Sequence, residues 1–163
     1  MSDPCPETAP LDLAPSTSRT IEVNGLALHY LEYDHPAAHD KPVMLCLHGG
    51  AAHAHWFDFV ASAFVGRYRV LSLDLRGHGD SAWGDAGSYS YIQYANDVAS
   101  AIASLGAGPV TLAGHSMGGM VSLVTAASYP DHVSTLIVID SMMQMSPDRA
   151  STLRSEEHTS ELQ

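Results

Sequence analysis

The sequence predicts an α/β fold in which a doubly wound, mostly parallel sheet is preceded by an N-terminal β-hairpin. From residue 43 onward, short apolar runs alternate with longer segments of helical spacing, which is the pattern of buried parallel strands and crossover helices. Upstream, Asn24-Gly25 separates two strand-like segments and is a strong signal for a two-residue hairpin turn. A length of 163 residues with 45% apolar content is enough for one domain with a buried core.

Each element can be placed in order along the chain. Residues 1–18 are rich in Pro, Ser and Thr, so we expect a disordered tail that cannot bury enough surface to offset its ordering. The hairpin strands are expected at 20–23 and 26–33, on either side of the turn. Four strands rich in Val, Leu and Ile then alternate with three segments of helical periodicity. The predicted strands span 43–47, 68–74, 109–114 and 134–140, and the predicted helices 55–64, 91–105 and 116–129.

Composition and charge exclude several classes of function. The chain has 18 acidic and 7 basic residues, a net charge of −11, and no Lys/Arg cluster, so we expect no nucleic-acid or membrane partner. No stretch has the length of a membrane span, and the first residues lack a basic signal-peptide start, which indicates a cytoplasmic protein. Cys5 and Cys46 lie far apart, and no metal cluster or cofactor fingerprint is present. We therefore expect a small-molecule substrate and no cofactor.

A candidate nucleophile lies where the third buried strand meets its helix. The segment GHSMG at 114–118 is a Gly-x-Ser-x-Gly motif between a predicted strand and a predicted helix, the context that a nucleophile elbow requires. Such a turn is sharp, and residues two before and two after Ser116 crowd together, which accounts for Gly114 and Gly118. Gly119 lets the helix approach the sheet closely. The alternative interpretation is a turn whose serine only caps the helix.

Two N–H groups are candidates for binding an oxyanion at this serine. Acyl transfer needs one donor from the residue after the nucleophile, which is Met117, and one from the loop after the first buried strand. In that loop, LHGGA at 47–51, we choose Gly50, with Ala51 as the alternative. We expect His48 to hydrogen-bond within its own loop and to shape it.

The other polar residues near strand ends receive mostly structural interpretations. In DLRGHGDS at 74–81 the charges are expected to pair locally and hold a tight turn. Asp140 ends the last predicted strand on the same edge of the sheet as Ser116 and is a candidate catalytic acid, with a turn residue as the alternative. The remaining predicted structural and surface residues are Arg76, His78, Asp80, Asp131 and His132.

Four motifs in sequence order resemble the α/β-hydrolase fold family. They are HGG (48–50), DLRGHGDS (74–81), GHSMGG (114–119) and YPDHV (129–133), and the resemblance covers residues 21–140. It implies a serine hydrolase with Ser116 as nucleophile and with Gly50 and Met117 as oxyanion donors. Because the elbow carries Ser, the resemblance points away from the epoxide hydrolase and haloalkane dehalogenase branches, which attack with a carboxylate. The longer HGGG run of the lipase-like branch is not matched.

The catalytic histidine that the family places after the acid is absent from the part of the chain that resembles it. The last histidine, His158, lies in RSEEHTSELQ, which resembles the translation of a common sequencing adapter, so we expect residues 154–163 to be a non-native tail. Residues 19–153 would then be the N-terminal part of an incomplete α/β-hydrolase core. We expect such a fragment to be inactive or nearly so and to leave an unpaired, aggregation-prone strand edge.

Three hypotheses for the function stay open at this point. The leading one is a parent enzyme of esterase type, with thioesters, lactones, C–C bonds and perhydrolysis as further reactions of the same fold. A non-catalytic ligand-binding protein is the second, and a genuine tail with His158 as a displaced base is the third. Further residues have both a pocket-lining and a packing interpretation: His53, His55, Trp56, Met142, Met143 and Met145.

Overall fold

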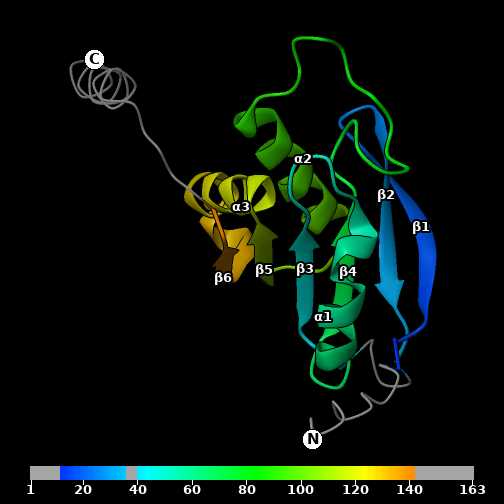
Figure 1. Cartoon of the computed structure of the whole chain (residues 1–163). Helices are drawn as coiled ribbons and strands as arrows, with labels where there is room; N and C mark the ends of the chain where they lie inside the picture. Colours follow the sequence, from blue (N-terminus) through cyan, green and yellow to red (C-terminus); the bar gives the residue numbers. More distant parts are fainter. Residues whose placement is uncertain (1–11, 36–39, 142–163) are drawn as a thin grey trace, which may run out of the picture.

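The structure, a computed structural model, describes residues 12–35 and 40–141. In this part of the chain six strands form one sheet: β1 (Ser16–Val23), β2 (Leu26–Tyr33), β3 (Val43–Leu47), β4 (Arg69–Leu73), β5 (Val110–His115) and β6 (Val133–Ile139). Their order across the sheet is β1-β2-β4-β3-β5-β6 (Figure 1). Strands β3 to β6 are parallel to their neighbours within that group, and β2 joins β4 in antiparallel orientation. The predicted fold class is confirmed.

Helices cover both faces of the sheet, as a doubly wound arrangement requires. The helical segments are η2 (Ala54–Phe57), α1 (Asp58–Phe64), α2 (Tyr91–Ser104), α3 (Met117–Ser128) and η3 (Pro130–His132). On one face, Phe57 and Ala61 pack with Cys46 and Ala113 of the strands. Helices α2 and α3 lie together over the opposite face (Figure 1), where side chains of both helices pack against the other sides of the same strands. The turns at the carboxyl ends of β3, β4 and β5 lie at one edge between these layers.

The N-terminal hairpin is longer than the sequence predicts. Its turn residues Asn24 and Gly25 have φ values of 51° and 78°, which is the pattern of a type I′ turn. Strand β1 begins at Ser16, which pairs with Tyr33, so residues 16–18 belong to the sheet and not to a tail. The composition argument failed there because β1 is an edge strand that exposes most of its side chains, so it tolerates Ser and Thr.

Cys46 lies in the middle of β3 and is completely buried. Burial raises the pKa of its thiol to about 12, so this cysteine packs as a small apolar side chain. Within residues 12–35 and 40–141, no helix is long and apolar enough to cross a membrane.

Several sequence predictions concern positions outside the described residues and stay predictions. They are the tail over residues 1–11 with Cys5, the methionines Met142, Met143 and Met145, and the segment 154–163 with His158.

Candidate active site

Ser116 occupies a strained turn between β5 and α3. Its φ is 51° and its ψ is −114°, a conformation that is unfavourable for a residue with a side chain. Two contacts from the end of β6 hold the turn in place. The N–H of Ser116 donates to the Ile139 carbonyl at 2.9 Å, and the Ser141 hydroxyl donates to the Ser116 carbonyl at 2.8 Å. The side chain thus stands at the carboxyl edge of the sheet and at the start of a helix.

The glycines of the elbow lie where no side chain fits. A Cβ at Gly114 would meet the carbonyl group of Gly118, one turn into the helix. A Cβ at Gly118 would meet the carbonyl oxygen of Leu47, at the end of β3. At Gly119 the obstacle is the Ser141 side chain. Because two of these neighbours are backbone atoms, substitution would force β3, β5 and α3 apart.

The loop after β3 lies directly against the elbow. A Cβ placed on Gly49 would be 2.9 Å from His115 Nδ1 and 3.3 Å from the Cβ of Ser116, so a side chain there would press on both residues. The loop then turns back through a hydrogen bond from the Ala52 N–H to the Gly49 carbonyl at 3.3 Å, with Ala51 at a φ of 58°. In the described part of the chain, the N–H of Gly50 donates to no other group. Gly50 is also an exposed residue.

Met117 supplies a second N–H beside Ser116 that donates to no group among the described residues. It is the first residue of α3, and the first N–H groups of a helix have no acceptor within it. The positive end of the helix dipole lies at the same place and favours negative charge. Gly50 and Met117 thus lie in the two segments that flank Ser116.

His48 is fully buried and links the Gly49 loop to the turn after β4. Its Nε2 accepts the N–H of Leu75 at 3.1 Å, so Nδ1 carries the proton and donates to the Gly49 carbonyl at 2.7 Å. Burial lowers the pKa of His48, which keeps the ring neutral. Since both nitrogens are engaged, His48 is not a base for Ser116. The sequence predicted that His48 bonds only within its own loop, but the hydrogen bond from the Leu75 N–H shows that His48 also holds the turn after β4.

Asp74 is a buried hub that sequence reasoning missed. Its carboxylate accepts hydrogen bonds from His29 Nδ1 at 2.8 Å, the Ala54 N–H at 2.6 Å and the Asp80 N–H at 3.0 Å. It therefore ties the hairpin and η2 to its own turn after β4. His29 Nε2 is in turn 2.8 Å from the Ser18 hydroxyl. The only signal was an Asp closing an apolar strand, and two of its three partners, His29 and Ala54, are 20 or more residues away.

The same hub gives the one candidate metal-binding group among the described residues. Ligand atoms of His29, Asp74 and Asp80 lie within 4.8 Å of one another. The His29 nitrogen and the Asp74 oxygens are already hydrogen-bonded within the protein. A metal ion would have to break those bonds, so the group is a hydrogen-bonded structural cluster.

The prediction that the charges of the turn at 74–81 pair locally is wrong for Arg76, which pairs with a residue outside the turn. Its guanidinium forms a bidentate pair with Asp97 of α2, at 2.5 Å and 2.7 Å, and also donates to the Ser88 carbonyl at 2.9 Å. Both side chains of the pair are almost completely buried, and the hydrogen bonds that Arg76 donates to Asp97 raise the pKa of Arg76. The turn is thus fixed against a helix. His78 does bond locally, through Nδ1 at 3.0 Å from the Arg76 carbonyl.

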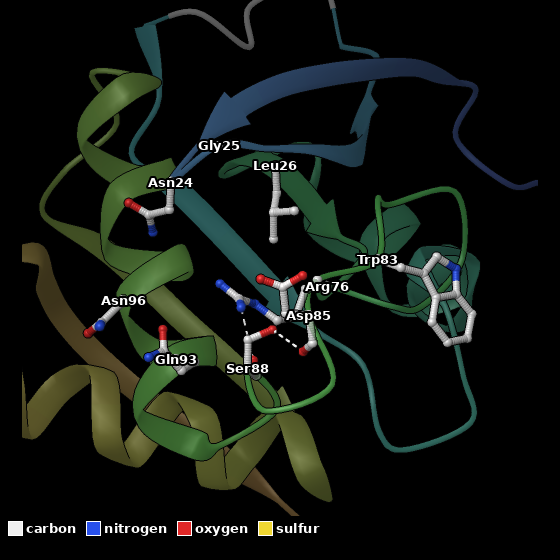
Figure 2. Close-up of a pocket in the computed structure, with 10 residues that line it drawn as sticks. Asn24, Gly25, Leu26, Arg76, Trp83, Asp85, Ser88, Gln93 and Asn96 are labelled. Carbon is white, nitrogen blue, oxygen red and sulfur yellow. Dashed lines mark hydrogen bonds between the residues drawn. The ribbon is translucent and has the colours of Figure 1, made fainter.

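Arg76 also lines a polar hollow of about 440 Å³ that is separate from the elbow. Figure 2 shows Asn24, Gln93 and Asn96 on one side of Arg76, and Trp83 on the other side with its ring directed away. Neither Ser116 nor Gly50 nor Met117 lines this hollow. We therefore place the candidate active site at the elbow.

Among the residues that the structure describes, the carboxylates and the histidine that follow Ser116 lie in two different places. Asp140 has a φ of 47° and an exposed side chain, and it follows Ile139, whose carbonyl holds the elbow. Asp131 and His132 belong to η3, beyond the far end of the helix that Ser116 begins. A helix of 12 residues is about 18 Å long, so those two are remote from Ser116. Within residues 12–35 and 40–141, no histidine is hydrogen-bonded to the Ser116 hydroxyl.

An aromatic pair lies on the α1 side of the elbow. The Trp56 ring stacks on His115, with ring centroids 5.2 Å apart and planes at 20°. Trp56 remains 56% exposed, and the buried Nδ1 of His115 has no hydrogen-bond partner in the described structure. Of the three candidate pocket residues near the loop after β3, Trp56 is thus the one stacked on the neighbour of Ser116. His55 is directed instead to Asp58, at 3.0 Å.

Comparison with protein families decides the relationship that this geometry suggests. A model of the alpha/beta hydrolase fold family matches residues 42–157, from β3 through the elbow and β6. The chain belongs to the α/β-hydrolase fold family. The resemblance drawn from the four sequence motifs is confirmed.

Similar proteins within the α/β-hydrolase fold family have names that describe more than one type of reaction. Epoxide hydrolase 4 of Mus musculus is 36% identical over 121 residues, which are 74% of this chain and 33% of that protein. An esterase of Mycobacterium tuberculosis is 37% identical over 100 residues, 61% of this chain and 33% of its own. The crystal structure of E-2-(acetamidomethylene)succinate hydrolase superimposes with a TM-score of 0.74 at 29% identity, covering 87% of this chain and 51% of the other. This chain spans a third to a half of their lengths.

Proposed function

We propose that this protein is a serine hydrolase that cleaves carboxylic ester-type bonds through an acyl-enzyme on Ser116. The observation that carries the proposal is the strained serine at the start of α3, with the free N–H groups of Met117 and Gly50 in the segments on either side. A serine held in this way is exposed to a substrate, while two donors beside it suit the negative charge of a tetrahedral intermediate.

In the proposed reaction the Ser116 oxygen attacks the carbonyl carbon of the ester, and its proton passes to a histidine base. The carbonyl oxygen becomes an oxyanion that accepts hydrogen bonds from Gly50 and Met117. Collapse of the intermediate expels the alcohol, which takes the proton back from the histidine, and water then hydrolyses the acyl-enzyme. We assign the acid to Asp140 and the histidine to a part of the parent protein beyond residue 153, with His158 as the alternative base.

The identity of the elbow residue favours ester cleavage over epoxide opening. Relatives include both an epoxide hydrolase and an esterase. Opening an epoxide through a covalent intermediate uses a carboxylate nucleophile, and this chain has Ser116 at that position. A serine hydroxyl with two N–H donors suits an acyl carbon, which also keeps thioesters, lactones and C–C bonds beside a ketone within the proposal.

The missing partner of Ser116 supports one alternative, a ligand-binding protein without catalysis. No described histidine bonds to the serine, so attack on a carbonyl lacks a base in this part of the chain. On that alternative the elbow and loop would bind a carbonyl compound without transforming it.

A fluorophosphonate probe separates the two, because it phosphonylates an activated serine and leaves an inactive one unmodified. We expect the chain extended with its parental downstream sequence to be labelled at Ser116, and residues 1–163 to be labelled at least about 100-fold more slowly, since general-base catalysis contributes about that much. Intact-mass spectrometry measures the labelled fraction, with Ser116→Ala as the negative control. No labelling of the extended chain would favour the binding protein, and fast labelling of residues 1–163 that is lost in His158→Ala would identify His158 as the base.

A further inference from the structure

A hollow whose described lining residues are all uncharged borders the start of α3, the helix that follows Ser116. Its volume is about 470 Å³, and its lining comes from α2, the residues just before it, and the first residue of α3. The lining residues are Tyr89, Ser90, Tyr91, Ile92, Tyr94 and Met117. Met117 is shared with the elbow, because its N–H is one of the two proposed oxyanion donors. The hollow therefore begins one residue from Ser116.

The floor of the hollow is held in place by packing and hydrogen bonds. Tyr94 is 6% exposed and packs in the core beneath α2. The Tyr89 hydroxyl donates to the Gly84 carbonyl at 3.1 Å and accepts the Gly84 N–H at 3.0 Å, while its ring abuts Gly77 and lies 6.3 Å from the Tyr94 ring. Both rings are fixed before any ligand arrives, which reduces the entropy lost on binding.

The rim of the hollow exposes apolar surface that the fold does not need. Tyr91 is 42% exposed and Ile92 is 65% exposed, although they begin a helix whose other side is well buried. Contiguous apolar exposure beside a cavity is typical of a binding surface. Because no described lining residue carries a charge, an ionised group placed there would lose its hydration without gaining a partner among them.

We propose that this hollow binds an uncharged, apolar chain of the substrate next to the reacting carbonyl, with Tyr91 and Ile92 as the residues that set chain-length preference. The inference rests on the proposed function for the position of the carbonyl at Ser116. An apolar chain that leaves the carbonyl on the Met117 side reaches Ile92 and Tyr91 without crossing a charged residue. The chain belongs either to the acyl part or to the alcohol part of the ester.

Binding of stable amides tests the hollow without any catalysis. Dissociation constants for the 163-residue chain are measured by saturation-transfer NMR with N-methylacetamide, N-methylhexanamide and N-hexylacetamide. A buried methylene strengthens binding up to about fourfold, and about twofold in a half-open hollow, so the added methylenes, four in N-methylhexanamide and five in N-hexylacetamide, give roughly tenfold or more. A gain with N-methylhexanamide assigns the hollow to the acyl part, and a gain with N-hexylacetamide assigns it to the alcohol part. Equal affinity for all three amides would overturn the proposal.

Substitutions test which residues cause the gain in amide affinity with chain length. Tyr91→Ser and Ile92→Ser each remove exposed apolar surface from the rim and should reduce the gain by at least threefold. Phe59→Ser is the matched control, because Phe59 is 61% exposed on α1, over the opposite face of the sheet, and this variant should keep the full gain. Circular dichroism verifies that each variant is folded. A gain that persists in both rim variants, or that disappears equally in Phe59→Ser, would contradict the proposal.

The outcome is independent of the test of the proposed function. If amides bind with chain-length preference but Ser116 in the extended chain is not labelled, the proposed binding in the hollow stands and the proposed hydrolase activity is rejected. If Ser116 is labelled but the amides bind without chain-length preference, the proposed hydrolase activity stands and the proposed binding in the hollow is rejected.

Discussion

His48 joins two segments of the candidate site through one neutral ring. Nδ1 holds the Gly49 carbonyl, and Nε2 accepts the N–H of Leu75 after β4. A carboxylate oxygen of Asp74 lies 3.9 Å from Nε2 of His48 and favours a positive charge on the ring. His78 and His53 oppose that charge. Burial is the largest influence and lowers the pKa of the ring, so protonation would have to break the Leu75 hydrogen bond.

This burial predicts a loss of stability in mild acid. Because the folded-state pKa of His48 is depressed, its contribution to stability is intact above the ordinary histidine value of about 6.5 and is lost as the pH falls below it, where the unfolded chain takes up the proton. The slope from one group is at most about 1.4 kcal/mol per pH unit. Urea unfolding of the wild type and His48→Gln at a series of pH values measures it, and the variant should show a shallower slope.

A histidine at the surface provides the control for this experiment. The His55 side chain is 53% exposed, so His55→Gln should leave the slope close to that of the wild type. Equal slopes for the wild type and His48→Gln would show that the ring is not held neutral by the fold.

Gly118 gives the strongest steric prediction in the molecule. A Cβ there would overlap backbone atoms of Leu47 and His48, which cannot move without separating β3 from α3. We expect Gly118→Ala to lower the free energy of unfolding by about 3 kcal/mol or more, as overpacking of a rigid core does. Chemical denaturation measures the difference. Gly87→Ala is the control with nothing within 4 Å of the added Cβ, and it should change stability by less than about 0.5 kcal/mol.

At the scale of elements, β6 is an edge strand of the sheet with exposed apolar side chains. In the described part of the chain it pairs with β5 alone, and Ile137, Val138 and Ile139 are each 38–40% exposed. Helix α3 contacts one face of this strand, while Ile137 lies beside Ala113, whose side chain belongs to the α1 face of the sheet. Helix α1 packs on that face over the middle of the sheet, so the β6 part of the face is left open to solvent.

An open apolar edge strand predicts self-association of the 163-residue chain. We expect oligomers in size-exclusion chromatography with light scattering at concentrations of tens of micromolar, where edge pairing becomes populated. Ile137→Lys should shift the distribution toward monomer, because charged residues blunt strand edges. Phe59→Lys adds the same charge on α1 and should have little effect. A wild type that stays monomeric throughout would contradict this prediction.

At this scale the sequence predicts some elements better than others. The strands from β3 to β6 and the helices α2 and α3 lie within a few residues of their predicted positions, because continuous apolar runs and helical spacing are local signals. The start of β1 was missed, since a strand on the sheet edge shows little apolar alternation. The first helix is shorter than expected, because the segment begins as η2 before α1.

For the whole molecule, the Arg76–Asp97 pair ties distant parts together. Asp97 accepts from Arg76 in the turn after β4 and from the Asn24 side chain in the hairpin turn, at 2.9 Å. One helix carboxylate thus fixes two turns at the same edge of the sheet. No local pattern predicts such a pair, since its members are separated by 21 residues and meet only in the folded chain. The Asp74 hub escaped prediction for the same reason, whereas the elbow motif was local.

Breaking this buried pair should be costly. Arg76→Met leaves Asp97 charged and unpaired, and we expect a loss of about 3–5 kcal/mol in the free energy of unfolding. The double variant Arg76→Met/Asp97→Leu should regain part of that loss, because no charge then remains buried. Arg19→Met is the control: Arg19 pairs with Glu32 but its side chain is 48% exposed, so a loss below about 1 kcal/mol is expected. Similar losses in the free energy of unfolding for Arg76→Met and Arg19→Met would show that breaking the buried Arg76 pair costs no more than breaking an exposed one.

The bond from Ser116 to Ile139 also sets an order of events during synthesis. Ser116 leaves the ribosome more than 20 residues before the end of β6, yet the elbow is held by the carbonyl of that later strand and by the Ser141 hydroxyl. A nascent chain that has not reached residue 141 lacks both restraints. The hydrogen bonds that hold the strained backbone of Ser116 therefore form only after β6 has docked, so the elbow is completed only when the sheet around it has been assembled.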